Sequence, residues 1–354
     1  MPNAAQASTA LSWYCWGSLS TIECGVDDAV EPRRWTGLED ADVVQCGGTH
    51  CLAVRSGQVH AWGANSHGQC GAERDNRIHP PTTVQFAVPV ETVACGWWHS
   101  LVLTRDGRVA SWGHPEQIGR DGDPFQCQLI PDVCQVRQIS CGFRHSIAVA
   151  NNGSVYAWGQ NKLNCSKQDH GGEACTFSVH RCPFRQLWTT PLSGIGTVIS
   201  AGENRYGQLG RNTSASLCSE WRPTDMDGRQ TIVDVRSGWS HVIALTRVGS
   251  VLAWGRSDFG QLGTPQGGPA PRIVPVPERV RSICCGSEHS LCLGETRLWA
   301  FGWNEHGNLG TGCTNNSFEP VPVGRLPSGE IVCVTAGGAI SFTCVRRINV
   351  DAAS

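Results

Sequence analysis

Lysine is nearly absent from this sequence. The 354-residue chain contains only Lys162 and Lys167, has no run of five or more basic residues, and carries a formal net charge of -2. A protein that grips nucleic acid without regard to base sequence needs a basic face, which this composition does not supply. We therefore expect no direct binding to DNA.

Long apolar runs are also missing. No stretch reaches the roughly 18–20 apolar residues of a membrane-spanning helix, so we expect no membrane-embedded segment. The first residues, MPNAAQASTALSWYCWG, have no positive charge before their weakly apolar part and do not resemble a signal peptide. With an odd total of 19 cysteines in a long chain, these features indicate reduced thiols and a cytoplasmic protein, with the nucleus as a second compartment.

A phosphate-binding loop is absent as well, because no Gly-x-x-x-x-Gly-Lys-Ser/Thr occurs. What the chain does contain is a repeat. Five Trp-Gly pairs and two degenerate copies recur at separations of 46, 50, 46, 43, 53 and 47 residues. The anchors are Trp16, Trp62, Trp112, Trp158, Ala201, Trp254 and Phe301. A period near 47 residues indicates an array of similar structural units.

A second element precedes most anchors. The segments CGGTHCLAV, CGWWHSLVL, CGFRHSIAV, SGWSHVIAL and CGSEHSLCL place histidine at positions 50, 99, 145, 241 and 289. Each ends in alternating apolar residues and runs through a turn, such as Asn152-Gly153, into the strand that carries Trp-Gly. This pattern predicts one β-hairpin per repeat.

The loop that follows the anchors can be interpreted in three ways. In GWNEHGNLGTGC (302–313), Asn304, Glu305 and His306 could form a metal or acid–base cluster, and the glycines could cradle phosphate. In the sister loops GANSHGQCG, GENRYGQLG and GRSDFGQLG, serine, arginine or aspartate stands in place of the glutamate, and histidine, tyrosine or phenylalanine stands at the histidine position. We therefore interpret the stretch as a repeat loop whose glycines hold special backbone positions.

Each end of the chain supplies half of one repeat. Residues 12–17 form a Trp-Gly strand without an upstream hairpin, and residues 333–345 supply upstream strands without a Trp-Gly after them. Pairing the two ends in one blade completes an all-β, seven-bladed propeller. We predict one domain over 12–345 with a loop insertion at 163–183, a disordered N-terminus (1–11) and a C-terminal tail (346–354).

These motifs resemble the regulator of chromosome condensation repeat family over roughly residues 12–345. The resemblance implies a seven-bladed propeller of four-stranded blades. Residues 237–263 and 285–312 are similar to the secretion-regulating guanine nucleotide exchange factors (the deafness-locus-associated type), and 285–312 also to the fungal killer-toxin-insensitivity propellers. The fungal resemblance implies binding to a small zinc-ribbon electron carrier that serves diphthamide synthesis and wobble-uridine modification of transfer RNA. The other implies nucleotide exchange on a Ran-like GTPase.

Several cysteines and histidines could have either a chemical role or a purely structural one. Four Cys-x-x-x-His pairs and one Ser-x-x-x-His could form thiolate–imidazole pairs, but their recurrence favours a packing element whose histidine bonds nearby backbone. Cys284-Cys285 could be a redox pair or inert buried thiols. The insertion contains Cys165, His170, Cys175, His180 and Cys182, without Cys-x-x-Cys, so zinc remains the alternative to a solvated loop. We predict no catalytic residue, no bound metal and no cofactor.

Tryptophan marks the candidate binding residues. The anchor tryptophans are expected between blades, whereas Trp97, Trp98, Trp239 and Trp303 lie in or beside the inter-strand loops, and Trp188 occupies a histidine position. They could pack against neighbouring blades or form an aromatic hot spot for a protein partner, with Glu288 and Glu305 as acidic contacts. Gly96-Trp97-Trp98-His99 and Gly238-Trp239-Ser240-His241 also resemble a motif of plant ultraviolet sensors, without its arginine. We predict a non-catalytic scaffold for the small zinc-ribbon protein; the alternative is an exchange factor for a Ran-like GTPase.

Overall fold

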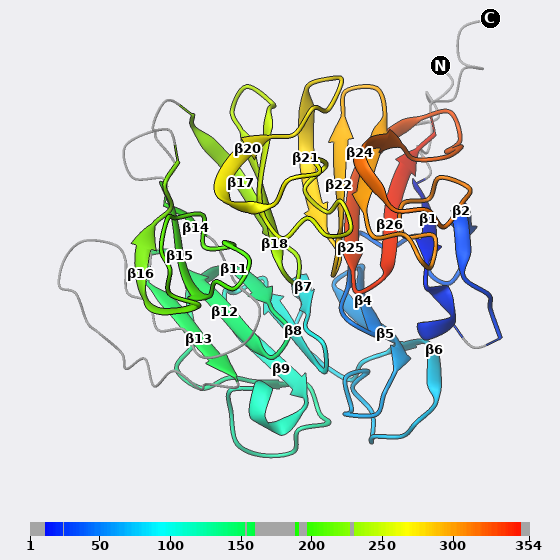
Figure 1. Cartoon of the computed structure of the whole chain (residues 1–354). Helices are drawn as coiled ribbons and strands as arrows, with labels where there is room; N and C mark the ends of the chain where they lie inside the picture. Colours follow the sequence, from blue (N-terminus) through cyan, green and yellow to red (C-terminus); the bar gives the residue numbers. More distant parts are fainter. Residues whose placement is uncertain are drawn as a thin grey trace, which may run out of the picture.

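The protein is an all-β ring of antiparallel sheets (Figure 1). The computed structural model describes residues 11–23, 25–152, 154–159, 188–190, 197–226 and 230–347. They contain 26 strands and two short 3-10 helices, η1 (Leu19–Thr21) and η2 (Pro115–Gln117). None of the helices in these ranges is long and apolar enough to cross a membrane. The prediction of an all-β propeller is confirmed.

Seven antiparallel sheets contain these strands. The sheet that joins the two ends of the chain, here called the closing sheet, consists of β25 (Glu330–Gly337), β26 (Ile340–Arg346), β1 (Leu11–Gly17) and β2 (Ala29–Trp35). The second sheet has β3 (Val43–Cys46), β4 (His50–Arg55), β5 (Gln58–Ala64) and β6 (Ile78–Thr83). The third has β7 (Val90–Cys95), β8 (His99–Thr104), β9 (Val109–Gly113) and β10 (Gln128–Leu129).

The remaining four sheets complete the ring. The fourth has β11 (Val136–Cys141), β12 (His145–Ala150) and β13 (Val155–Gly159), and the fifth has β14 (Trp188–Thr190), β15 (Thr197–Glu203) and β16 (Leu217–Pro223). The sixth has β17 (Ile232–Ser237), β18 (His241–Thr246), β19 (Val251–Gly255) and β20 (Gly268–Ile273). The seventh has β21 (Val280–Cys285), β22 (His289–Gly294), β23 (Leu298–Gly302) and β24 (Ser317–Pro322).

The predicted set of seven four-stranded blades is met only in part. Five sheets have four strands, whereas β11–β13 and β14–β16 have three each among the described residues. The predicted insertion at 163–183, most of residues 1–11 and most of the tail at 346–354 lie outside the described residues. Seven complete blades, and these segment boundaries, therefore stay predictions.

The two ends of the chain close the ring together. β1 pairs antiparallel with β26 over seven residues, from Leu11 opposite Arg346 to Gly17 opposite Ile340, and the two strands lie side by side in Figure 1. β2 and β25 flank this pair in the same sheet. The predicted pairing of the N-terminal and C-terminal strands is confirmed.

The Trp-Gly anchors each serve two purposes. Trp16, Trp62, Trp112 and Trp254 are fully buried, and Trp158 is half-buried. The glycine after each of the seven anchors has a φ between +96° and +117°. At Gly302 this left-handed backbone coincides with an irregularity in strand pairing and with a close approach to the backbone of Glu288 and His289, which a side chain would obstruct.

Four of the five motif histidines bond to a serine of the next sheet rather than to nearby backbone, which corrects the sequence interpretation; neither ring nitrogen of the fifth, His145, has a hydrogen-bond partner among the described residues. Nε2 lies 2.8–2.9 Å from a serine Oγ in the pairs His50–Ser100, His99–Ser146, His241–Ser290 and His289–Ser341. Three of these serine hydroxyls donate to a backbone carbonyl, so the histidine Nε2 must be the donor in those pairs. The feature of the sequence that could have predicted this bond was the serine that follows the histidine in several copies of the motif.

This network makes stability depend on pH. Burial lowers the pKa of His50, His99 and His289 to about 3, far below the unfolded value of about 6.5. The unfolded chain therefore binds more protons, and the free energy of unfolding should fall as the pH drops below about 6.5, by up to about 1.4 kcal/mol per pH unit per histidine. Urea unfolding of the unaltered chain and of His99→Gln at pH 7, 6 and 5 measures this dependence. The free energy of unfolding of the variant should fall less steeply with falling pH, by the contribution of one histidine. Equal slopes would contradict it.

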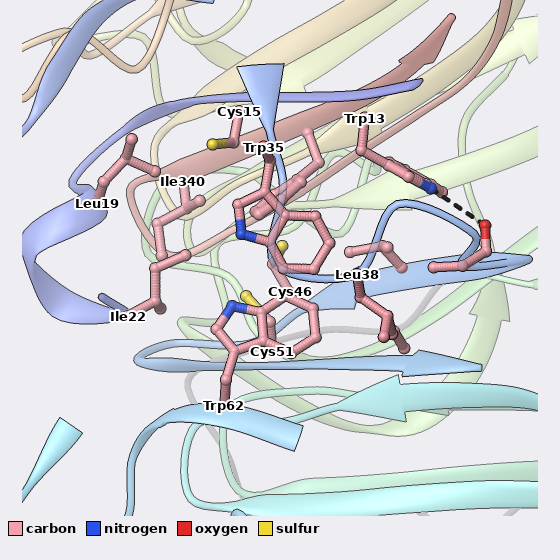
Figure 2. Close-up of a cluster of buried hydrophobic side chains, with 14 of the residues drawn as sticks. Trp13, Cys15, Leu19, Ile22, Trp35, Leu38, Cys46, Cys51, Trp62 and Ile340 are labelled. Carbon is pink, nitrogen blue, oxygen red and sulfur yellow. Dashed lines mark hydrogen bonds between the residues drawn. The ribbon is translucent and has the colours of Figure 1, made fainter. Parts of the chain in front are cut away.

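A large apolar cluster fills the space between the closing sheet and β3–β6. Figure 2 shows Trp35 over Trp62, with ring centroids 4.8 Å apart. Trp13 Nε1 donates to the carbonyl oxygen of Ala41 at 3.1 Å, which satisfies the buried indole. The cluster joins residues from both ends of the chain, because Phe342 packs edge-on against Trp35.

Candidate partner-binding face

One end of the ring is built from the turns that follow the innermost strands. We define the axial face as the turns at 46–50, 95–99, 141–145, 237–241, 285–289 and 336–340, with the loops that leave the Trp-Gly anchors beside them. The turns surround a cavity of about 130 Å³ on the axis. Backbone hydrogen bonds join neighbouring turns, as from Trp97 N to Phe143 O and from Trp239 N to Ser287 O. The loops therefore form one continuous surface.

The glycine of each turn is needed for space. A Cβ at Gly96 would lie 2.1 Å from Cε1 of His99, and one at Gly238 would lie equally close to Cε1 of His241. Only glycine lets the turn fold over the buried histidine that bonds the next sheet. The turn is thereby fixed, and the side chain after the glycine borders the axial cavity.

Three aromatic side chains converge at this cavity from three sheets. The Trp97 ring lies 4.7 Å from that of Phe143 and 5.0 Å from that of Trp239, and Phe143 lies 5.9 Å from Trp239. All three residues are half-buried and line the cavity. We call Trp97, Phe143 and Trp239 the aromatic triad. Half-exposed aromatic rings held by their neighbours are typical of hot spots in protein interfaces.

Trp98 forms a second, cationic group beside the triad. Its ring stacks on His67 at 4.4 Å and on His114 at 5.7 Å, and the Arg144 guanidinium lies 4.7 Å from its centroid. Burial lowers the pKa of His67 and His114, and the charge of Arg144 adds to the effect. The two imidazoles are therefore mostly neutral at pH 7, and Arg144 supplies the positive charge of this group.

Trp303 and Glu305 lie apart from the triad, on the loop after β23. Trp303 is half-buried and meets His306 edge-on at 5.3 Å, while His306 Nδ1 lies 2.7 Å from Oδ2 of Asp28. Glu305 is exposed. The backbone N of Trp303 donates to the carbonyl oxygen of Glu288 at 2.9 Å, which ties this loop to the turn at 285–289. The loop thus adds an aromatic ring and a free-standing carboxylate to the same face.

Glu288 lies beneath the surface instead of on it. Its side chain is buried, and the carboxylate accepts hydrogen bonds from Ser240 Oγ and Gln261 Nε2, with Arg256 NH1 3.6 Å away. Burial raises the pKa of the Glu288 carboxyl, against the effect of the hydrogen bonds. In the structure it holds neighbouring loops together, and its contact with a partner stays a prediction.

Sequence reasoning missed Phe143 and Arg144, although both occupy the motif positions of Trp97 and Trp98. The available signal was their place at the two variable positions of the Cys-Gly-x-x-His motif. The sequence prediction took only tryptophans at these positions as binding residues. Trp188 lies in β14, whose backbone alone is described, so its side-chain role stays a prediction.

The chemical alternatives find no support in the described residues. Burial raises the pKa of Cys285 to about 12 and that of Cys284 well above its usual value, as expected for inert thiols. No group of three metal-binding side chains occurs in the described ranges. The candidate zinc ligands at 165–182 lie outside them.

Comparison with known proteins agrees with this architecture. The RCC1-like domain family matches residues 90–343, and the regulator of chromosome condensation repeat matches 56–103. The chain is 27% identical to the secretion-regulating guanine nucleotide exchange factor of Bos taurus, over 92% of this chain and 81% of that protein. It is 28% identical to the ultraviolet-B receptor UVR8 of Arabidopsis thaliana, over 85% of this chain and 62% of that protein.

A solved structure shows the same fold. The crystal structure of Prp20p from Saccharomyces cerevisiae, a protein studied for its binding to Gsp1p and histones, superimposes with a TM-score of 0.83. The match covers 97% of this chain and 93% of that chain, at 20% sequence identity.

Proposed function

Because this chain belongs to the RCC1-like domain family, we propose that it is a seven-bladed propeller that serves as a non-catalytic platform and binds a protein partner on its axial face. The observation that carries the proposal is the aromatic triad, which three separate sheets hold half-exposed around one axial cavity. Such a preassembled apolar centre with polar surroundings loses little side-chain freedom on binding.

We further propose that the partner is a small zinc-ribbon electron carrier, in support of diphthamide synthesis and wobble-uridine modification of transfer RNA. The support is the resemblance of residues 285–312 together with the exposed Glu305 beside Trp303. These roles belong to the cytoplasm, with the nucleus as a second compartment.

The test is a calorimetric titration of the full chain with the purified zinc-loaded protein. We expect saturable one-to-one binding that Trp303→Ala and Glu305→Ala each weaken. Absence of binding, or binding that neither substitution changes, would remove the zinc-ribbon protein as the partner. Affinity purification from cells then identifies the partner that occupies the axial face.

A Ran-like GTPase is the second candidate partner. Its support is the name of the relatives, secretion-regulating guanine nucleotide exchange factor, which match 92% of this chain. An exchange factor needs no phosphate-binding loop of its own, since the GTPase carries the nucleotide. Release of a fluorescent GDP from the GTPase, measured with and without the chain, decides the matter: an increase well above the spontaneous rate supports exchange activity, and an unchanged rate excludes it for that GTPase.

A further inference from the structure

Two cysteines face each other in the closing sheet. Cys333 of β25 and Cys344 of β26 are direct partners in the antiparallel register. Directly opposite residues of antiparallel strands have Cα atoms about 4.5–5.5 Å apart, which lies inside the range of about 4.4–6.8 Å found for disulfides. The strand pairing is irregular between Ile331 and Cys333 and regular from Cys333 to the turn, so the two cysteines lie directly opposite each other.

The two thiols differ in exposure. Cys344 is only 1% exposed, because β26 lies between β25 and β1, where Trp13 is its cross-strand neighbour. Cys333 is half-buried at the edge of the apolar cluster. The hydrogen bond from the Cys344 thiol lowers the pKa of Cys333. Cys333 is thus the more exposed member of the pair, and Cys344 lies opposite it in a buried strand.

We propose that Cys333 and Cys344 form a reversible redox pair that hydrogen peroxide converts into a disulfide. The Cys333 thiolate attacks a peroxide oxygen, the O–O bond breaks, and sulfenic acid and water form. The Cys344 sulfur then attacks the sulfenic sulfur and releases a second water. In total two thiols lose two protons and two electrons to one peroxide. This modification site is independent of the partner-binding function proposed above.

The chain contains a matched control pair. Cys46 of β3 and Cys51 of β4 are also direct cross-strand partners, and Figure 2 shows both inside the apolar cluster. Both are buried, and burial raises the pKa of the Cys51 thiol well above its usual value. This pair is likewise directly opposite in the register but lacks a half-buried member. Cys46–Cys51 should therefore stay reduced under conditions that oxidise Cys333–Cys344.

The pair lies close to the axial face along the chain. β25 and β26 are joined by the turn at Gly337 and Gly338, which borders the axial cavity. The carbonyl oxygen of Gly338 accepts hydrogen bonds from the backbone N and Oγ of Ser287. A disulfide four residues before and six residues after this turn would restrain it.

A single tryptic digest measures the oxidation state of both cysteine pairs. Cys333 and Cys344 lie between Arg325 and Arg346 with no lysine or arginine between them, and Cys46 and Cys51 lie likewise between Arg34 and Arg55. Trypsin therefore releases each pair in a single peptide. In the disulfide form each peptide loses two hydrogens and takes up no alkylating reagent, whereas the reduced form takes up two.

The experiment treats the full chain, carrying Cys134→Ser and Cys313→Ser to remove two exposed thiols, with hydrogen peroxide before alkylation and mass spectrometry. We expect the disulfide in peptide 326–346 to form at least about tenfold faster than in peptide 35–55 and to disappear with dithiothreitol. Equal rates, or oxidation of Cys333 without a disulfide, would overturn the proposal. Cys333→Ser, at the half-buried position, should abolish the product; if Cys344→Ser folds, its Cys333 should accumulate as sulfenic acid that dimedone traps.

Discussion

Replacement of Trp16 with alanine is expected to lower the free energy of unfolding by about 3–5 kcal/mol, the largest effect in the molecule. Trp16 is fully buried, and it belongs to the same apolar cluster as Leu291 and Leu298 of the seventh sheet, although it lies in the N-terminal strand. Its Nε1 donates to the carbonyl oxygen of Asn308 at 2.8 Å. The substitution removes this bond and opens a cavity at the seam that the two ends of the chain close. Urea unfolding of the full chain measures the change.

Two control variants separate the possible causes. Trp16→Phe keeps an aromatic ring but loses the donor, so it should cost about 1–3 kcal/mol. Val248→Ala removes an apolar side chain that is 73% exposed and should change the stability by no more than about 0.5 kcal/mol. A loss at Trp16→Ala as small as that at Val248→Ala would mean that the N-terminal strand does not complete the ring in solution.

Replacement of Trp97 or Trp239 with alanine is expected to weaken partner binding by about 30-fold each, equivalent to about 2 kcal/mol. Both rings belong to the aromatic triad and remain half-exposed while their neighbours hold them in place. Because the two rings are in contact at 5.0 Å, the double variant should lose less than the sum of the two single losses. Titration of the stoichiometric partner from affinity purification measures the three dissociation constants.

Trp299→Ala is the matched control for these variants. Trp299 is also a half-buried tryptophan, but it lies at the start of β23, near the hairpin turn at the opposite end of the ring. Its Nε1 donates to Oε1 of Glu278 at 2.6 Å. Its loss should reduce stability and leave the dissociation constant unchanged. Equal weakening by Trp299→Ala and Trp97→Ala would show that the effect comes from general loosening of the fold and not from the axial face.

The repeat made the architecture predictable from the sequence. Spacing between the Trp-Gly anchors predicted the succession of sheets, and the two half-repeats at Trp16 and Cys344 predicted the strand pairing that closes the ring. Such features are local in sequence or recur in register. They appear in a single chain because each unit must meet the same packing requirement as its neighbours.

Contacts between sheets were not predictable in the same way. The partner of His99 is Ser146, 47 residues away, and the donors to Glu288 come from Ser240 and Gln261 on the preceding sheet. Whether the carboxylate of Glu288 is buried or exposed depends on these neighbours, and a single copy of the motif does not identify them. The same limit applied to the aromatic triad, whose members meet only once the ring has curved.

Hydrogen–deuterium exchange of the complex with its stoichiometric partner tests whether the partner binds the axial face. We predict that binding slows exchange in peptides covering 95–99, 141–145 and 237–241, the turns of the axial face. Peptides covering 104–108, 246–250 and 294–297, the hairpin turns at the other end of the ring, should exchange as in the free chain. Protection confined to the latter turns would place the partner on the opposite end and contradict the axial face as the binding surface.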